Sequence, residues 1–398
     1  MAVTLEKINE CLVCGSQNLE EIVTLPNLPL TGNFVRANAQ KDFSGFDLKL
    51  AFCQQCNHLQ LAEQLHSEEV YTSKDYAFRV ENSHTGRNNN ILLVEHLKRA
   101  CPNKIFKCVV DVGCNDLFLL RLVKAISHVQ VGLDPIWSGS QEKRTDDGIY
   151  LFGGTIEDFD AKKLPKKPDL IMCSHTLEHL SHPREALEKM FDMGDEETLY
   201  LFEMPSSDIM RLRYRFDQLF HHHYQYFSKE SLATLIEKAG GEVMSITQSN
   251  HHWGGLIVLF KKEGANSRQN SQHVKRTETT ANTIKKEYAY FKEETARLAE
   301  LINGINEPFY GYGAAQLLPV NAYHWNWDFS NLKCILDDDP AKHDISYRNL
   351  NVRIQNPDIS MNVQDSTVLI TALDNLASIL SNLKKDPPRR IINPLIVV

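Results

Sequence analysis

The pattern of apolar and polar positions along the chain predicts a first series of alternating strands and helices. It begins with an amphipathic helix at Asn88–Arg99, where apolar residues recur at helical spacing. The strands that follow are short apolar runs separated by helical segments. The predicted strands are Lys107–Val112, Val129–Leu133, Asp169–Ser174, Leu199–Met204, Glu242–Gln248 and Gly255–Phe260, and the predicted helices are Leu117–Ile126, Arg184–Asp192 and Lys229–Ala239. This alternation predicts a mainly parallel sheet with helices on both faces.

A second series follows a polar linker, Lys261–Gln272, and a long charged helix, Val274–Asn303, that we expect to bridge two bodies. Its predicted strands are Phe309–Tyr312, Lys333–Leu336, Thr367–Thr371 and Ile391–Ile392, with a helix at Leu317–Tyr323. Both series share one order: strand, glycine turn, helix, and a strand with an acidic end. We therefore predict two Rossmann-like units rather than a repeat array.

The segment before about residue 85 has a different pattern, with no long helical period. Phe46–Phe52 alternates apolar and polar residues, which predicts a strand, and Leu25–Phe34 is interrupted by proline and glycine. The predicted fold class is therefore α/β, with a small β-rich N-terminal domain before the Rossmann-like units. We expect domains at residues 1–70, 71–262 and 306–398, with the linker and bridging helix at 263–305.

Composition and charge narrow the functional class. The chain has 398 residues, of which 42% are hydrophobic and 24% charged, and a formal net charge of −8. An acidic chain is a poor partner for nucleic acid or an anionic membrane. No apolar run approaches the roughly 20 residues that span a bilayer, and Met1–Glu10 does not resemble a signal peptide. We expect a cytoplasmic protein that exists as a monomer or homodimer.

Four of the nine cysteines form two closely spaced pairs, Cys11 with Cys14 and Cys53 with Cys56. Four thiolates in two such pairs are typical of a tetrahedral structural zinc site. A β-rich segment of about 60 residues has little core of its own, so a metal would stabilise it. Free thiols or a redox pair are the alternatives, but neither pair has the strand-to-helix context of a redox motif.

The first strand of the Rossmann-like series ends in a turn that is suited to a nucleotide-like ligand. Asp111 lies at the strand end and Gly113 opens the turn, while Asn115 stands where a left-handed backbone is often needed. Asp134 closes the next strand, where an acidic residue reaches ribose hydroxyls. This arrangement suits S-adenosylmethionine or NAD, and a turn without a ligand is the structural alternative.

Residues at later strand ends favour the methyl donor. Glu157 and Asp158 follow a probable third strand and are candidates for contacting the adenine. His175, Thr176 and His179 follow the strand Asp169–Ser174, at the edge where such sheets bind ligands.

With these motifs, the chain resembles the sugar C-methyltransferases that act on nucleotide-linked 4-keto-deoxysugars. The likeness runs nearly end to end and includes the cysteine pairs, Asp111–Asp116, Thr176–His179, Glu203–Pro205, Phe216–Ser228, His252–Leu256, Gly311–Ala315 and Asp337–Lys342. It implies a zinc domain, a central domain for S-adenosylmethionine, and a C-terminal domain that helps to hold the nucleotide-sugar. It also implies that His179, Glu203 and His252 contact the acceptor, and that Gly313 and Asp337 face its nucleotide.

The chain departs from the family pattern at several positions. The family segment Tyr-His-Glu-His reads Phe220-His-His-His223 here, so that His222 stands in place of a glutamate. Leu117 replaces a glycine in the donor turn, and Trp253 replaces the first glycine of a later element. These departures bear on the acceptor and on proton transfer more than on the fold.

The resemblance implies a reaction that needs a base and an oxyanion donor. Methylation of a carbon beside a ketone requires removal of its α-proton, and the enolate then attacks the methyl group. His223 matches the family's base, and His222 is a candidate to orient or replace it. Tyr76 and Tyr226 are candidate donors to the enolate oxygen. A structural role, or a stray metal, is the alternative for the histidine run.

Three other functions stay open at this point. A methyltransferase of the same architecture could act on a hydroxyl. An NAD-dependent oxidoreductase could use either glycine turn, although Asn115 and Leu117 break the usual glycine pattern. A non-catalytic protein could retain both nucleotide folds, and the second glycine turn could serve only packing.

Overall fold

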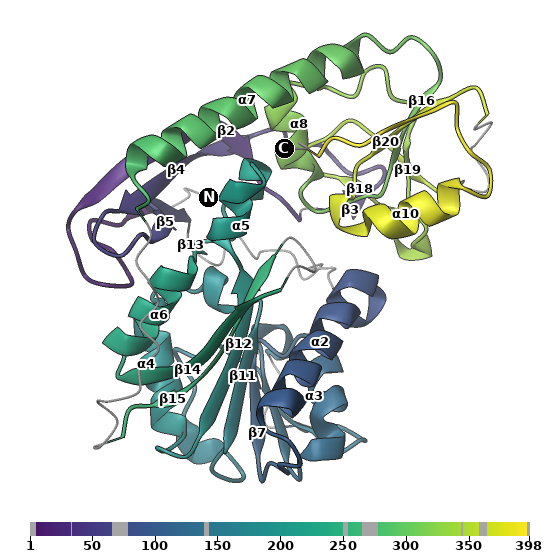
Figure 1. Cartoon of the computed structure of the whole chain (residues 1–398). Helices are drawn as coiled ribbons and strands as arrows, with labels where there is room; N and C mark the ends of the chain where they lie inside the picture. The colour runs from purple at the N-terminus through teal and green to yellow at the C-terminus, as the bar shows by residue number, and fades with distance from the viewer. Residues whose placement is uncertain are drawn as a thin grey trace.

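The computed structural model describes residues 5–32, 34–65, 79–138, 143–249, 254–264, 278–343, 345–357 and 364–395. A central sheet with its helices forms the lower part of the molecule in Figure 1, with the N-terminal strands and the C-terminal domain above it. Helix α7 (Ala281–Asn303) crosses the top and contacts both the N-terminal strand β2 (Leu19–Pro29) and α8 (Leu318–His324). Within these residues, no helix combines the length and apolar character that crossing a membrane would need.

The central sheet has eight strands in the order β14-β15-β12-β11-β7-β8-β10-β9. These are β7 (Val109–Val112), β8 (Gln130–Leu133), β9 (Lys143–Arg144), β10 (Tyr150–Phe152), β11 (Leu170–Ser174), β12 (Leu199–Pro205), β14 (Gly241–Gln248) and β15 (Gly255–Lys262). The five strands from β12 to β10 are parallel, and an antiparallel hairpin, β14 with β15, completes one side. The predicted Rossmann-like core is confirmed.

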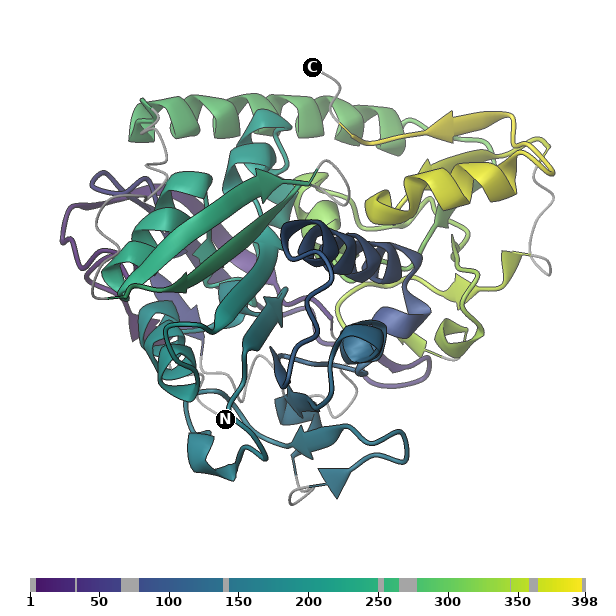
Figure 2. The ribbon, with the colours of Figure 1, turned by 60° about the horizontal axis from the view of Figure 1, so that its bottom comes forward.

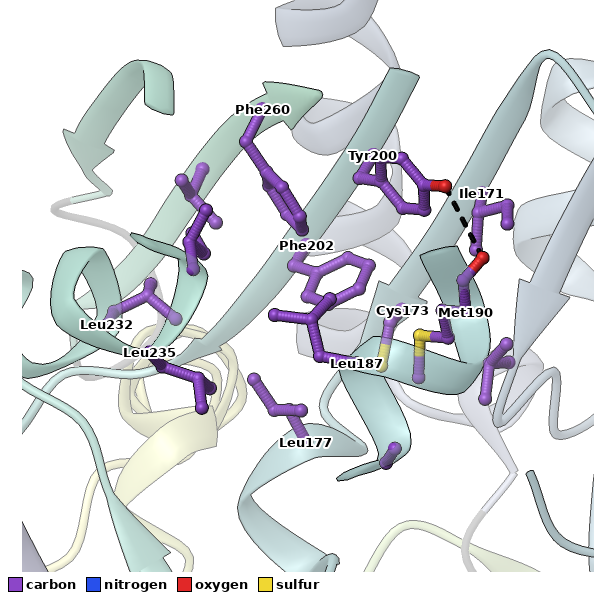
Figure 3. Close-up of a cluster of buried hydrophobic side chains, with 14 of the residues drawn as sticks. Ile171, Cys173, Leu177, Leu187, Met190, Tyr200, Phe202, Leu232, Leu235 and Phe260 are labelled. Carbon is purple, nitrogen blue, oxygen red and sulfur yellow. Dashed lines mark hydrogen bonds between the residues drawn. The ribbon is translucent and has the colours of Figure 1, made fainter. Parts of the chain in front are cut away.

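Alternate side chains of the central strands enter two different apolar cores, as expected for a sheet that is covered on both faces. On one face, Phe202 and Phe260 pack edge to face, and Tyr200 stacks on Phe260. Figure 3 shows this core, in which the Tyr200 hydroxyl donates a hydrogen bond to the carbonyl oxygen of Met190 at 3.3 Å. On the other face, Leu201 and its neighbours form a separate cluster.

Two helices cover each face of the central sheet, and serine side chains cap α2 (His84–Ala100) and α6 (Lys229–Lys238) at their N-termini. Helices α4 (Pro183–Met193) and α6 cover the Tyr200 face, and α2 and α3 (Phe118–Val123) cover the opposite one. A capping box between Ser228 and Ser231 begins α6. Helix α2 lies between the central sheet and the C-terminal domain, as Figures 1 and 2 show.

The N-terminal sheet contains a strand from the middle of the chain. Its order is β13-β5-β4-β2, with β4 (Gly45–Cys53), β5 (Leu59–Leu61) and β13 (Gln225–Tyr226). A separate ribbon pairs β1 (Leu5–Lys7) with β6 (Glu63–Leu65). Since β13 follows the predicted catalytic histidines, the N-terminal sheet directly supports that segment.

The C-terminal domain is a second parallel sheet, in the order β19-β17-β16-β20-β21. Its elements are β16 (Phe309–Tyr312), β17 (Ile335–Leu336), β19 (Ile354–Gln355), β20 (Thr367–Ile370), β21 (Arg390–Ile392) and α10 (Leu376–Leu383). The strand β3 (Phe34–Arg36) pairs with β18 (Ile345–Tyr347), so the first and last domains share a ribbon. The second predicted Rossmann-like unit is therefore present.

Two predicted boundaries are wrong. The linker predicted at 261–272 begins too early, because Lys261 and Lys262 continue β15, where Lys261 forms an ion pair with Glu242 at 3.4 Å. The bridging helix begins at Ala281, after an N-cap at Thr280, rather than at 274. Residues 265–277 lie outside the described chain, and the domain boundaries as a whole stay a prediction.

Candidate active site and zinc centre

The four predicted cysteine ligands lie together at the start of the N-terminal domain. The Sγ atoms of Cys11 and Cys56 are 3.6 Å apart, as are those of Cys14 and Cys53, and all four lie within 4.8 Å of one another. A tetrahedron with Zn–S bonds of about 2.3 Å has S···S edges of roughly 3.8 Å. The geometry thus fits a zinc ion held by four thiolates.

The two cysteine pairs share one local design. Gly15 and Asn57 follow the second cysteine of each pair and have φ angles of 75° and 56°. Their backbone N–H groups donate back to the carbonyl oxygens of Cys11 and Cys53 at 2.8 and 2.9 Å. These two tight turns point the thiolates of each pair toward a common centre.

The loop after β7 has a left-handed backbone at three positions, including Asn115, where it was predicted. Gly113, Asn115 and Leu117 have φ angles of 81°, 44° and 71°. The backbone N–H of Asn115 donates to Asp134 Oδ2 at 2.9 Å, so Asp134 holds the loop in place. Because Leu117 occupies a conformation that favours glycine, the family's glycine at this position has a physical reason.

Asp111 and Asp134 lie at neighbouring strand ends and differ in their surroundings. Asp134 also accepts a hydrogen bond from the N–H of Ile136 at 2.9 Å. Asp111 is only 2% exposed, and no donor among the described residues reaches its Oδ1. Burial, with the nearby Asp134 charge, raises the pKa of Asp111 to about 8. A buried carboxyl group with one oxygen that has no donor among the described residues suits a cationic ligand group such as the ammonium of S-adenosylmethionine.

Glu157 and Asp158 follow β10 and lie at the same edge of the sheet. Phe152, the last residue of β10, pairs with Leu133 at the end of β8. Asp158 accepts a hydrogen bond from the Thr155 hydroxyl at 3.3 Å, and Glu157 is half-buried. Contact of either residue with an adenine stays a prediction.

A short 3-10 helix, η5 (Leu177–His179), lies between two parts of the site. One is the loop Gly113–Leu117, called the donor loop here, and the other is Phe220–His223, called the histidine segment. A β-carbon added at Gly113 would lie 1.9 Å from the hydroxyl oxygen of Thr176, the N-cap of η5, so only glycine permits this contact. At its other end, the ring of His179 lies 4.8 Å from that of His223. The predicted donor and acceptor residues therefore lie along one continuous edge.

Two buried carboxyl groups line this edge. Glu203, 2% exposed, accepts a hydrogen bond from the Ser174 hydroxyl at 3.2 Å, and burial raises its pKa. Its backbone carbonyl accepts the N–H of His175 at 2.8 Å. Glu178, also 2% exposed, lies 3.4 Å from Nδ1 of His175. Glu178 belongs to the motif Thr176–His179, but no role was predicted for it, because the motif does not show that its carboxyl group is buried beside histidines.

The predicted base, His223, lies among aromatic rings and other imidazoles. Its ring is 4.2 Å from that of Phe220 and 6.0 Å from that of Tyr226. Burial, together with the imidazoles of His179, His175 and His222, holds the pKa of His223 well below 6.5. The ring is therefore neutral at pH 7 and able to accept a proton.

The other two histidines of the run have different partners. His221 donates from Nε2 to the carbonyl oxygen of Phe46 at 3.1 Å, and burial lowers its pKa to about 4. The carbonyl oxygen of His222 accepts a hydrogen bond from Nδ1 of His179 at 2.7 Å, while the His222 side chain is buried. His221 thus attaches the histidine run to β4, and the backbone of His222 orients the ring of His179.

Tyr226 has a backbone partner, and two other candidates cannot be placed. The Tyr226 hydroxyl accepts the N–H of Phe220 at 3.1 Å and donates to its carbonyl oxygen at 3.3 Å, which closes the histidine loop. Tyr76 and His252 lie outside the described residues. A donor role for either tyrosine toward an enolate stays a prediction.

The C-terminal glycine turn repeats the design of the donor loop. Asp337 Oδ2 accepts the N–H of Ala314 at 2.6 Å, as Asp134 does with Asn115. The amine of Lys342 lies 3.1 Å from the same oxygen. A β-carbon on Gly313 would lie 2.2 Å from that of Ala372, so the loop is tightly packed. Nucleotide contact by Gly313 and Asp337 stays a prediction.

Comparison with known proteins agrees with this geometry. Residues 87–246 match the family description of a methyltransferase domain, and residues 11–71 match that of a zinc binding domain. The C-methyltransferase NovU of Streptomyces niveus is 25% identical over 338 residues, which cover 77% of this chain and 76% of NovU.

Two solved methyltransferase structures are also similar in part. The N-methyltransferase NodS from Bradyrhizobium japonicum WM9, in complex with S-adenosyl-l-homocysteine, is 14% identical with a TM-score of 0.37, over 50% of this chain and 97% of NodS. Human N-acetylserotonin methyltransferase in complex with SAM is 15% identical with a TM-score of 0.37, over 50% of this chain and 59% of that protein.

The fold and the matched domains together define an S-adenosylmethionine-dependent methyltransferase. More particularly, its match to a zinc binding domain precedes its match to a methyltransferase domain. The similarity to the C-methyltransferase NovU agrees with the C-methyltransferase part of the resemblance that the motifs indicated.

Proposed function

We propose that this enzyme methylates a carbon beside the ketone of a nucleotide-linked 4-keto-deoxysugar. The observation that carries the proposal is the continuity of the edge through η5, from Gly113 against Thr176 to His179 against His223. This continuity brings a buried donor loop close to a neutral histidine base. The similarity to a C-methyltransferase over most of both chains supports transfer to carbon.

The donor end of the edge would hold S-adenosylmethionine. Asp111 would bind the ammonium group of the donor. Asp134 would bind the ribose hydroxyls and would keep its hydrogen bond to the N–H of Asn115 in the loop. Glu157 or Asp158 would contact the adenine, and Asn115, His175 and Thr176 would shape the pocket. When bound, S-adenosylmethionine supplies an electrophilic methyl group on a sulfonium centre.

The histidine end would activate the acceptor. A C–H bond beside the ketone breaks, its proton passes to a ring nitrogen of His223, and the electron pair remains on the sugar as an enolate. His222 would orient His223 or replace it as the base, and its carbonyl oxygen holds the ring of His179. Tyr76 and Tyr226 are the candidate donors to the enolate oxygen, and Tyr226 would have to exchange its hydrogen bond to the Phe220 carbonyl oxygen for one to the enolate.

The rest of the acceptor would extend away from the donor loop. His179, Glu203 and His252 would contact the sugar, and Gly313 and Asp337 would face the nucleotide. The proposal takes the acceptor as a small molecule, and a cytoplasmic location and a monomeric or homodimeric state stay predictions.

The direct test is incubation with a dTDP- or GDP-linked 4-keto-6-deoxysugar and methyl-labelled S-adenosylmethionine. We expect a product heavier by one methyl group, whose NMR spectrum shows the new group on carbon. The hydroxyl alternative predicts the same mass with the methyl group on oxygen. Methylation on oxygen, or no methylation while the donor still binds, would contradict transfer to carbon.

A further inference from the structure

The buried carboxylate of Glu178 has no assigned role in the reaction so far. It is the middle residue of η5 and only 2% exposed, and neither of its oxygens accepts a hydrogen bond from the described residues. The titratable group that faces it most directly is His175, whose Nδ1 lies 3.4 Å from Oε1. A carboxylate buried in this way needs a cationic partner for its charge to be tolerated.

Histidines are the possible partners. A carboxylate oxygen of Glu178 and ring nitrogens of His179 and His223 all lie within 4.8 Å of one another. His179 donates from Nδ1 to the carbonyl oxygen of His222. A carbonyl oxygen can only accept, so neutral His179 carries its proton on that nitrogen.

The backbone holds this arrangement in place. The carbonyl oxygen of Glu178 accepts the N–H of Tyr224 at 2.9 Å, and Tyr224 directly follows His223. The carboxylate and the base are therefore positioned by adjacent peptide units. This contact does not depend on the side-chain conformation of either residue.

We propose that Glu178 is a positioning residue whose carboxylate stabilises the imidazolium formed when His223 takes the α-proton. The inference rests on the proposed function. The proton moves from the sugar carbon to His223, and the electron pair stays on the sugar as an enolate. An opposite charge at about 4–6 Å favours the protonated form of an imidazole.

The other groups around His223 make this partner necessary. His175, His179 and His222 disfavour a positive charge on His223, and Tyr226 and Phe220 contribute only ring contacts. Glu203 is engaged by the Ser174 hydroxyl. Among the described residues, Glu178 is the carboxylate that groups with His179 and His223.

The first test measures the pKa of His223 by NMR in full-length, zinc-loaded protein with isotope-labelled histidine. The His223 signal is assigned by its loss in His223→Gln. In Glu178→Gln we expect the pKa of His223 to fall by about one unit, because the anionic neighbour is lost. Glu178→Asp should give a smaller fall. Glu242→Gln, which removes a carboxylate paired with Lys261 in the β14–β15 hairpin, should leave it unchanged.

The second test follows deuterium exchange at the sugar α-carbon as a function of pH. In the plot of exchange rate against pH, Glu178→Gln should move the acidic limb to lower pH. It should also slow exchange on the plateau about tenfold, while the affinity for S-adenosylmethionine stays unchanged. The NMR titration needs no acceptor, so failure of the keto-sugar reaction leaves the Glu178 measurement valid. An unchanged or raised His223 pKa in folded Glu178→Gln and Glu178→Asp would overturn the proposal. The proposal would also be overturned if the wild type bound a second metal ion tightly and both Glu178 variants lost it. Glu178, His179 and His223 would then be ligands of a metal ion.

Discussion

At the scale of single residues, Asp134 and Asp111 show how the same type of side chain takes different roles in different surroundings. Asp134 has a backbone N–H group on each oxygen and shapes the loop. Asp111 has the higher pKa, because it is fully enclosed beside the charge of Asp134. The first is therefore a structural acceptor, and the second is suited to a cationic ligand.

Replacing Asp111 with asparagine should change the stability of the protein and its affinity for S-adenosylmethionine in opposite directions. Because its pKa rises from 3.8 to about 8 on folding, the wild-type carboxyl lowers stability as the pH rises through that range. Asp111→Asn should therefore melt above the wild type at pH 8, with little difference at pH 4. Its affinity for S-adenosylmethionine should fall about tenfold or more, measured by calorimetry.

The pH dependence of donor binding provides the control. Between pH 6 and about 7.5, binding to the wild type should tighten with rising pH as Asp111 ionises, and this trend should vanish in Asp111→Asn. Equal affinity in both proteins would remove Asp111 from the donor site.

Residue roles could be predicted from the sequence where their determinants are local. The zinc cysteines and the two aspartates follow from short spacings and strand ends. The role of His221 could not, because its partner, Phe46, is 175 positions away. Likewise, the sequence pattern does not show that the hydroxyl of Tyr226 bonds to the backbone of Phe220, six residues earlier.

At the scale of elements, the histidine segment depends on β5 and β6 of the N-terminal domain. The carbonyl oxygen of Tyr224 accepts the N–H of Leu61, and its hydroxyl donates to the carbonyl oxygen of Leu65 at 2.7 Å. Gln225 bridges His58 and the carbonyl oxygen of Leu180, which caps η5. The positions of His179 and His223 are therefore set by strands from a different domain.

Tyr224→Phe tests this dependence. It leaves one buried carbonyl group unpaired, so we expect a loss of about 1–3 kcal/mol in unfolding free energy. Turnover should fall with donor affinity unchanged, because the histidine loop loses a support. The readouts are denaturant unfolding and steady-state methylation.

The matched control is Tyr200→Phe, which also removes a fully buried hydroxyl that binds a carbonyl oxygen (Figure 3). This residue lies in the core under α4, away from the histidines. Similar destabilisation with normal turnover is expected. Equal losses of turnover in the two variants would mean that Tyr224 acts only through stability.

The elements themselves were predicted best in the central sheet, where buried strands are continuous apolar runs. Strand β2 was not predicted, because Pro26 and Pro29 suggest a break. As an edge strand with a register shift between Leu25 and Leu28, β2 accommodates them. Pairings such as β3 with β18, or β13 with β5, join distant segments and have no local signature.

At the scale of the whole molecule, the zinc centre and the reaction edge are connected through one sheet. Cys53 ends β4, β4 pairs with β5, and β5 pairs with β13 beside the histidine run. The donor loop belongs instead to the central sheet. Loss of zinc should therefore affect the two ends of the edge differently.

Removing zinc by chelation should abolish turnover while leaving S-adenosylmethionine binding within a fewfold of normal. Metal analysis should show about one zinc ion per chain before treatment. Restoration of turnover by added zinc would establish that the loss is reversible. Full activity in zinc-free protein would contradict the dependence of the histidine segment on this centre.

The most direct measurement is deuterium uptake by a nucleotide-linked 4-keto-6-deoxysugar in D2O, followed by mass spectrometry in the absence of S-adenosylmethionine. We expect the wild type to introduce deuterium at the α-carbon and His223→Gln to introduce none, although both proteins bind the donor. Uptake at the wild-type rate in His223→Gln, or none with wild type that still methylates the sugar, would contradict proton abstraction by His223.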